Sequence, residues 1–358
     1  MKIIHTADIH LGSKINSFPK DVSASRKEEV RNSFKRLVEF ANLNDVKVIL
    51  ISGDLFDGIK PLVKDKEFFF SVVQNNPNID FLYLKGNHDF MLEGKDYSNL
   101  KTFNTEWSYY RYGNVCIAGV EIVKENATSI YSTLSLNDND INIVMLHGEV
   151  GDSVGVDKVN LSKLRNKNVN YLALGHYHSN LFEKLDDKGV YAYSGCLEGR
   201  GYDETGKKGF VLLDVQDKLS YDFMPFSQRE ISVVKVDVTN LKDAYSIYLN
   251  AKAVANFDKN GIYRVELIGE IDASIDGVAE DVKKYLSNEA SYIDVKDLTK
   301  KKLDISKYQS DTSLKGEFVR LVYGDKELPE DEKLKIISYG LKALAGEEID
   351  LWKFYPAI

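Results

Sequence analysis

The stretch IIHTADIHLG, residues 3–12, joins a short apolar run to an aspartate and a histidine two positions apart, Asp8 and His10. On an extended chain, residues two positions apart point their side chains to the same side. The stretch therefore predicts a buried β-strand that presents a carboxylate and an imidazole together at its carboxyl end.

Four later segments repeat this arrangement of an apolar run followed by polar residues that can bind a cation. They are Gly53, Asp54 and Asp57 after residues 48–51; Gly86, Asn87, His88 and Asp89 after residues 81–84; His147 after residues 143–146; and Gly175, His176, Tyr177 and His178 after residues 171–174. Open α/β sheets place their active sites at the carboxyl ends of their strands. We therefore expect the five segments to meet at one site.

Short apolar runs continue to about residue 215, and helical stretches separate the early ones, for example Val30, Phe34, Leu37 and Ala41. Strands that alternate with helices indicate a layered α/β fold. After residue 225, alternating strands and helical faces predict a small β-α-β-α-β domain, a loop-rich crossing at residues 296–311 and two final helices. We place the domains at residues 1–225, 226–305 and 306–358.

The 358 residues carry a net charge of −8 and a pI near 5.4. An overall basic surface, the simplest sign of a nucleic-acid binder, is therefore excluded, and any contact with a polyanion must be local. Cys116 and Cys196 lie far apart, and no apolar run reaches the length of a membrane span. With no apolar leader, we expect a reduced, cytoplasmic protein without membrane contact.

Aspartate, histidine and asparagine ligands without a thiolate favour divalent ions such as Mn, Fe, Zn or Mg. Seven such residues suit two ions rather than one. Two ions that share a carboxylate, roughly 3.5 to 4 Å apart, can clamp both the attacking and the leaving oxygens of a phosphoryl displacement. The motifs therefore predict a two-metal phosphoryl-transfer centre.

Together, the five motifs resemble the calcineurin-like metallophosphoesterase family, over about 225 residues. Within that family, residues 5–12, SGCLE at residues 194–198 and KGFV at residues 208–211 are more similar to the SbcD and Mre11 nucleases than to protein phosphatases. The resemblance implies a four-layer α/β/β/α sandwich, a smaller α+β capping domain and C-terminal helices.

The resemblance also implies the role of each site residue. One ion would bind Asp8, His10, Asp54 and His178, and the second would bind Asp54, Asn87, His147 and His176, with Mn the first candidate. His88 would contact the scissile phosphate and protonate the leaving oxygen, and Asp57 would hold its imidazole. Some archaeal relatives have a histidine where this chain has Asp57. Two dications against two ligand carboxylates would attract a phosphodiester to an otherwise acidic protein.

The function implied by the resemblance is hydrolysis of DNA in repair, as a 3′ to 5′ exonuclease and single-strand endonuclease. It also implies a separate SbcC or Rad50-like coiled-coil ATPase as partner, and it leaves a homodimer open. The metal motifs alone do not choose the substrate, so a phosphatase or cyclic-nucleotide phosphodiesterase is the alternative. A non-catalytic scaffold is a third class, whose signature would be missing ligands.

Some conspicuous residues have simpler interpretations. His5 lies within a strand, one side-chain face away from Asp8, and is expected to be structural. Cys116 is expected in the core and Cys196 near the site, while Lys300 to Lys302 suit a solvated loop better than a DNA contact. Residues 201–208, GYDETGKK, are one residue short of a P-loop, and the strand that follows argues against nucleotide binding.

Overall fold

The structure is a computed structural model that describes the chain except for residues 59, 88, 90–96, 273–274, 303 and 347–358. It divides into two compact units, which we describe separately. Unit 1 comprises Met1–Val233, Asp258–Tyr263 and Ala290–Tyr292, and unit 2 comprises the remaining ranges. The domain boundaries expected at residues 225/226 and 305/306 stay predictions.

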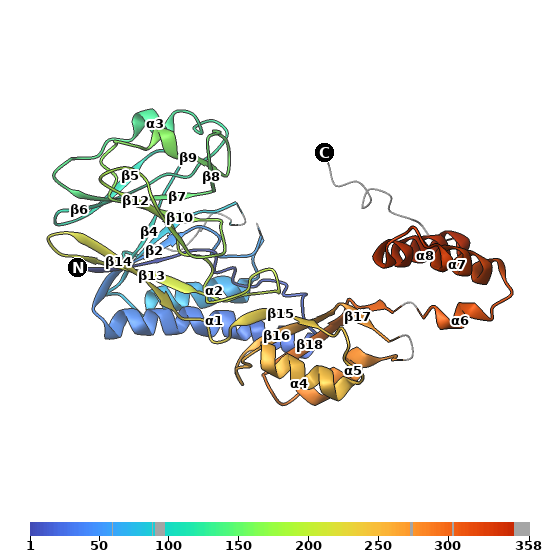
Figure 1. The fold of residues 1–358 in the computed structure, drawn as a ribbon. Coiled ribbons are helices and arrows are strands. Elements are labelled where there is room, and N and C mark those ends of the chain that lie inside the picture. Colours follow the sequence, from blue (N-terminus) through green and yellow to red (C-terminus); the bar gives the residue numbers. More distant parts are fainter. Residues whose placement is uncertain (59, 88, 90–96, 273–274, 303, 347–358) are drawn as a thin grey trace. The chain divides into compact units, whose positions relative to one another are not determined.

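Unit 1 is built on two six-stranded sheets within the described residues (Figure 1). The first has the order β14 (Leu219–Pro225), β13 (Gly209–Val215), β1 (Lys2–Thr6), β2 (Val46–Ser52), β3 (Asp80–Leu84), β4 (Leu100–Thr102). The second has the order β11 (Leu181–Lys184), β12 (Val190–Tyr193), β10 (Tyr171–Gly175), β7 (Ile141–His147), β6 (Val115–Gly119), β5 (Ser108–Tyr112). Strands β1 to β4 are mutually parallel, as are β6, β7, β10 and β12.

The two sheets pack face to face, because successive residues of their strands alternate between two cores. On β2, Val48 and Leu50 face the second sheet, where they join Ile143 and Ala173. Ile49, from the same strand, faces the opposite way, toward the helices. This alternation follows from the two-residue period of a strand.

Helices α1 (Lys20–Leu43) and α2 (Val63–Gln74) cover the outer face of the first sheet (Figure 1). Apolar residues at helical spacing on α1, including Val30, Phe34 and Leu37, form that contact. Among the described residues, the outer face of the second sheet carries short elements: α3 (Ile130–Thr133), a 3₁₀ turn (Leu161–Lys163), and the paired strands β8 (Glu149–Gly151) and β9 (Lys158–Asn160). The fold is thus the expected layered α/β sandwich, with a thin fourth layer.

His5 on β1 is fully buried and connects the two sheets. Its Nδ1 lies 2.9 Å from the Tyr171 hydroxyl, and its Nε2 lies 3.2 Å from the Leu174 carbonyl oxygen. Because a carbonyl can only accept, Nε2 donates to Leu174 and Nδ1 accepts from the Tyr171 hydroxyl. Burial lowers the pKa of His5 to about 3, so the folded protein holds a neutral imidazole in the structural role that the sequence favoured.

We expect His5 to lower the free energy of unfolding by about 2 kcal/mol between pH 7 and pH 5. The unfolded chain binds a proton near pH 6.5, whereas the folded chain does so only near pH 3. Folded-state stability is therefore lost as the pH falls below 6.5. Urea unfolding of the wild type and His5→Asn at both pH values measures this difference. An equal pH dependence in the two proteins would contradict it.

Unit 2 contains most of a three-stranded sheet in the order β15 (Ile231–Asp237), β16 (Ile262–Ile268), β18 (Tyr292–Asp297). Helices α4 (Ala244–Val254) and α5 (Val278–Leu286) connect these strands, and α4·α5 contacts lie within the unit. The predicted β-α-β-α-β order is confirmed. Helices α6 (Ser306–Gln309), α7 (Leu314–Gly324) and α8 (Glu330–Leu344) follow, and α7 packs against α8.

The crossing expected at residues 296–311 is more structured than predicted. It includes the end of β18, helix α6 and β19 (Lys300–Lys301), which pairs with β17 (Glu270–Ile271). Elements of two to four residues are too short to show a hydrophobic period, which explains the error. Lys300 and Lys301 therefore lie on a strand with exposed side chains, and Lys301 forms an ion pair with Asp276. In the described parts of the chain, no helix combines the length and apolarity needed to cross a membrane.

Candidate metal centre

The predicted ligands lie just beyond strands of both sheets. Asp8 and His10 follow β1, Asp54 follows β2, and Asn87 follows β3, three parallel neighbours in the first sheet. In the second sheet, His147 ends β7, and His176 and His178 follow its parallel neighbour β10. Parallel neighbours end at the same edge of a sheet, which brings these loops together.

The first group of ligand atoms belongs to Asp8, His10 and His178, and these atoms lie within 4.8 Å of one another. The Nε2 atoms of His10 and His178 are 3.3 Å apart, and His178 Nε2 lies 4.0 Å from Asp8 Oδ1. Asp54 Oδ2 approaches this group, at 3.8 Å from His10 Nε2. These are the four residues predicted for one ion.

The second group comprises Asp8, Asp54 and His147, again with ligand atoms within 4.8 Å of one another. His147 Nε2 lies 3.6 Å from Asp54 Oδ2 and 3.0 Å from Asn87 Oδ1. The ring centroids of His147 and His176 are 5.4 Å apart. Asp8 thus belongs to both groups. Asp54 belongs to the second group and lies close to His10 of the first. The assignment of Asp54 as the bridging ligand stays a prediction.

Three of the imidazoles are oriented so that Nε2 faces the cluster. In each, Nδ1 lies against an oxygen: His10 at 3.3 Å from Asp57, His147 at 2.9 Å from the Ser52 carbonyl, and His178 at 2.7 Å from Glu204. An acceptor at Nδ1 holds the proton there and leaves the Nε2 lone pair for a cation. Burial also lowers the pKa of His10 and His147, which favours the neutral, ligating form.

The backbone around the cluster is strained. Asp8, His10, Asp54 and His176 all have positive φ, at 51°, 51°, 52° and 106°. Such conformations cost roughly 1 to 3 kcal/mol each in a non-glycine residue, and they concentrate at functional sites. Gly86 permits a further close approach, because a Cβ there would lie 2.2 Å from Asp54 Oδ1.

Asp89 holds two of the ligand loops together. Its buried carboxylate accepts hydrogen bonds from the backbone N–H groups of Leu55, Phe56 and Gly86. These donors flank Asp54 and Asn87 along the chain. The carboxylate therefore fixes the spacing between the loops after β2 and β3, which is the turn-stabilising role expected of an aspartate in such a loop.

Of the two predicted catalytic residues, His88 lies outside the described residues. Asp57 Oδ1 lies 3.3 Å from His10 Nδ1 and 3.7 Å from Arg200 Nη1. These contacts place Asp57 behind a predicted metal ligand. Its expected role in holding His88 stays a prediction.

Glu204 is a site residue that the sequence did not reveal. It lies in residues 201–208, the segment that resembles a P-loop, and its carboxylate accepts from His178 Nδ1 and from Arg200. Burial alone would raise the pKa of Glu204, but the hydrogen bonds from His178 and Arg200 hold it below its ordinary value. The segment runs directly into β13, so it lacks the helix that a P-loop requires.

Two further buried side chains, Cys196 and Lys208, contact the backbone carbonyl of His178. Cys196, free and buried as expected, has its Sγ 3.4 Å from the His178 carbonyl oxygen. Lys208 is also buried and donates to the same oxygen at 2.8 Å. Together with Glu204, they fix both the backbone and the ring of His178.

We expect Glu204→Gln to weaken cation binding by about 10- to 100-fold, because the neutral amide orients and polarises His178 less strongly. Isothermal titration with Mn measures this change. Glu39→Gln on the exposed face of α1 is the matched control. Equal affinity in the Glu204 and Glu39 variants would show that Glu204 only fills space.

The electrostatics of the cluster favour bound cations. Burial raises the pKa of Asp8 to about 8, and the neighbouring Asp54 adds to the effect, although His178 opposes it. A divalent cation beside this carboxylate would restore its charged form. The cluster therefore fits two cations in its donor types, spacing and ring orientation.

A cavity lined by charged side chains borders the cluster. Its volume is about 390 Å³, and Asn87 and His147 are among its lining residues. Two lysines, Lys85 and Lys124, line it together with three carboxylates, Asp89, Glu121 and Asp157.

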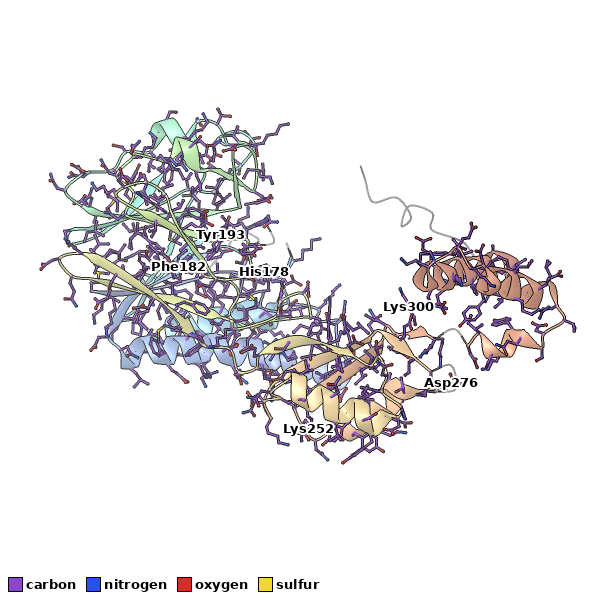
Figure 2. All side chains as sticks on the ribbon, in the orientation of Figure 1. His178, Phe182, Tyr193, Lys252, Asp276 and Lys300 are labelled. Carbon is purple, nitrogen blue, oxygen red and sulfur yellow. The ribbon has the colours of Figure 1, made fainter. Side chains whose placement is uncertain are left out.

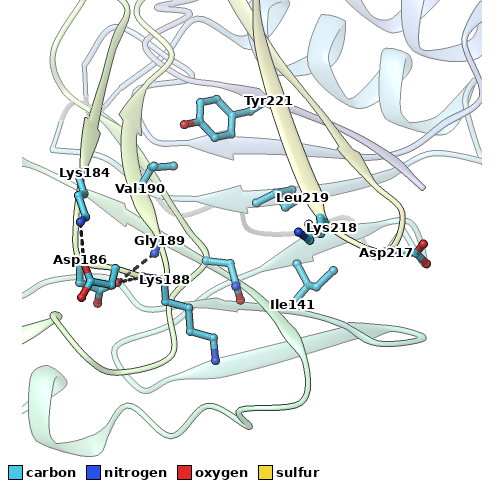
Figure 3. A pocket seen from close by; sticks show the side chains of 12 residues that line it. Ile141, Lys184, Asp186, Lys188, Gly189, Val190, Asp217, Lys218, Leu219 and Tyr221 are labelled. Atoms are coloured by element: carbon cyan, nitrogen blue, oxygen red, sulfur yellow. Dashed lines mark hydrogen bonds and ion pairs between the residues drawn. The ribbon is translucent and has the colours of Figure 1, made fainter.

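A different cavity, of about 500 Å³, lies at the other end of the strands (Figure 3). Its wall includes Ile141, Val190 and Leu219, at the starts of β7, β12 and β14. Lys184 there forms an ion pair with Asp187, and Asp186 accepts from backbone N–H groups. Because the ligands lie at the carboxyl ends of β7 and β10, this cavity is separate from the metal centre.

Residues 1–180 match the calcineurin-like phosphoesterase family, and the chain belongs to this family. It is 28% identical to the uncharacterized metallophosphoesterase YhaO of Bacillus subtilis, in an alignment that covers 69% of this chain and 66% of YhaO. It is 24% identical to the DNA double-strand break repair protein Mre11 of Sulfolobus acidocaldarius, in an alignment that covers 97% of this chain and all of that protein. A subunit of the nuclease SbcCD from Staphylococcus saprophyticus is 24% identical, over 72% of this chain and 77% of its own length. The resemblance stated from the motifs is confirmed at the level of the family and these relatives.

Proposed function

We propose that this protein hydrolyses phosphodiester bonds in DNA with two divalent cations, Mn being the first candidate. The observation that carries the proposal is the clustering of Asp8, His10, Asp54, Asn87, His147, His176 and His178 at the ends of neighbouring strands. Asp8, His10, Asp54 and His178 would hold one cation, and Asp54, Asn87, His147 and His176 the other. A complete ligand set argues against the non-catalytic scaffold.

Bound cations would supply an activated water at neutral pH and stabilise charge on the phosphoryl oxygens. Side chains of this protein would bind the substrate and donate the proton. Lys85 and Lys124, in the cavity beside Asn87 and His147, would contact the phosphodiester. His88 would donate a proton to the leaving oxygen, and Asp57 would orient it.

The choice of DNA as substrate is supported by the names of the relatives, which include a DNA double-strand break repair protein and part of a nuclease. We also propose 3′ to 5′ exonuclease and single-strand endonuclease activity in DNA repair, as the resemblance of the motifs implies. A Rad50 or SbcC-like ATPase is the proposed partner, and a homodimer is a further proposal. A phosphatase or cyclic-nucleotide phosphodiesterase remains the second candidate, because a two-cation centre acts on any accessible phosphoester.

The test is a cleavage assay on metal-stripped protein to which Mn or Mg is restored. Labelled single-stranded and duplex DNA, run on a denaturing gel, should shorten only with the cation present, and not with Asp54→Asn. Intact DNA combined with turnover of 4-nitrophenyl phosphate or a cyclic nucleotide would move the function to the second candidate. Intact DNA without turnover of either compound would reject both.

A further inference from the structure

Tyr177 is an exposed aromatic residue between two predicted metal ligands. It separates His176 from His178 in the loop after β10, and 53% of its surface is exposed. Its ring meets the ring of Tyr193 edge to face, with 5.6 Å between centroids. Figure 2 labels Tyr193 and His178, the residue that follows Tyr177. The exposed ring is therefore accessible to a substrate that binds at the cluster.

The ring of Tyr177 lines a pocket of about 410 Å³, within the usual size range of small-ligand sites. Val150, Leu181, Tyr191 and Tyr193 form its apolar and aromatic walls, and His176 forms the side toward the metal centre. A group bound in this pocket would therefore lie directly beside a phosphate held at the cluster.

The pocket is held in place before anything binds. The Tyr193 hydroxyl donates to the Gly148 carbonyl at 2.8 Å and accepts from the Val150 N–H at 2.9 Å. These two hydrogen bonds fix the ring of Tyr193 against β8, and the ring of Tyr177 packs edge to face against it. A fixed aromatic wall loses little entropy when a flat ligand stacks on it.

The charges around the cluster separate two kinds of surface. The cavity beside Asn87 and His147 is lined by five charged side chains: Lys85, Lys124, Asp89, Glu121 and Asp157. The Tyr177 pocket has no lysine or arginine among its lining residues in the described chain, and its one carboxylate, Glu149, forms an ion pair with Lys158. The Tyr177 pocket is therefore the surface that suits a flat uncharged ring.

We propose that Tyr177 is the stacking platform for the nucleobase next to the scissile phosphodiester, so that a single base is held in the Tyr177 pocket during cleavage. This inference rests on the proposed function and specifies how the substrate strand lies. Because every nucleobase has a π-face, stacking of this kind tolerates any sequence but requires a base that is unstacked from its neighbours. The site would therefore prefer single-stranded or frayed ends over internal duplex.

The first test uses the unaltered protein with Mn and single-stranded oligonucleotides that carry one stable abasic residue. The abasic residue is placed on one side of the cleaved bond, then on the other. We expect kcat/KM to fall between about 5-fold and 150-fold at one of the two positions, the range for loss of one base–aromatic stack. Equal rates for abasic and intact strands at both positions would overturn the inference.

The second test uses variants of Tyr177. Tyr177→Phe keeps the ring and should cleave as the wild type does, whereas Tyr177→Ala should lose as much on intact DNA as the wild type loses on the abasic strand. In Tyr177→Ala, the abasic residue should cause no further loss. Tyr109→Ala, at another exposed tyrosine, is the matched control. An additional abasic effect in Tyr177→Ala would show that the base binds elsewhere.

Plasma emission on the same variants measures bound metal, which should remain unchanged. If Tyr177→Ala lost metal, the abasic strands on the wild type would decide the question alone. DNA cleavage without an abasic effect would overturn the stacking role and leave the nuclease intact. Intact DNA with turnover of bis(4-nitrophenyl) phosphate would reject the nuclease, and the stacking role with it.

Discussion

Asp54→Asn is expected to remove both cations and to lower phosphodiester hydrolysis by more than about 10⁴-fold, because each cation contributes several kcal/mol of transition-state stabilisation. Asp54 Oδ2 lies 3.8 Å from His10 Nε2 and 3.6 Å from His147 Nε2, between the imidazoles of the two groups. An amide has the same shape but carries no charge. It would leave Asp8 as the one anionic ligand among the residues assigned to the cluster.

Asparagine is the right substitution because the backbone at Asp54 is left-handed, with φ of 52°. Aspartate and asparagine both tolerate that conformation, so a loss of metal would not reflect a distorted loop. Asp45→Asn is a matched control, since Asp45 is exposed and has φ of 55°. Bound metal per chain is measured by plasma emission after dialysis.

The metal stoichiometry also decides which carboxylate bridges. Loss of both ions would support Asp54 as the shared ligand. Loss of one ion would assign Asp54 to a single site and make Asp8 the bridge, in line with its presence in both groups of ligand atoms. An unchanged stoichiometry of two would contradict any ligand role for Asp54.

The ligand loops could be predicted from sequence because each is a local signal, a short apolar strand that ends in a turn containing aspartate or histidine. His5 could be separated from them by its position within the strand, and the structure buries it between the sheets. That the loops converge follows from a general property of parallel strands, which needs no knowledge of particular side-chain contacts.

The role of Glu204 could not be predicted, because no local sequence pattern indicates that it pairs with His178. Its hydrogen bond to His178 joins residues that are 26 positions apart and meet only when β13 enters the first sheet. The fourth layer was expected, but its short elements could not be located from sequence for a related reason. The four residues of α3 show no helical period, so their type depends on packing against the second sheet.

Whether Asp8 or Asp54 would bind both cations could not be predicted from the sequence either. Both carboxylates follow neighbouring parallel strands, and each lies within a few ångströms of both groups of imidazoles. Differences in oxygen position of this size arise from the left-handed turns of the two loops, which a residue pattern does not specify.

His88→Ala is expected to keep both cations and to lose about 10²- to 10⁴-fold in kcat for DNA, the usual contribution of a positioned general acid. Its neighbours in the sequence already have partners. Asn87 Oδ1 lies 3.0 Å from His147 Nε2, and the Asp89 carboxylate accepts hydrogen bonds from backbone N–H groups. That division leaves His88 as the proposed proton donor of the motif.

The decisive comparison is between leaving groups. An alkoxide leaving from DNA needs a proton, whereas 4-nitrophenolate leaves without one, so His88→Ala should cleave bis(4-nitrophenyl) phosphate at close to the wild-type rate. In the wild type, kcat for DNA should fall at high pH as the donor loses its proton, and this limb should disappear in the variant. His176→Ala is the control that should lose metal and fail on both substrates. If His88→Ala also lost metal, His88 would be a ligand and the division of roles within residues 86–89 would be wrong.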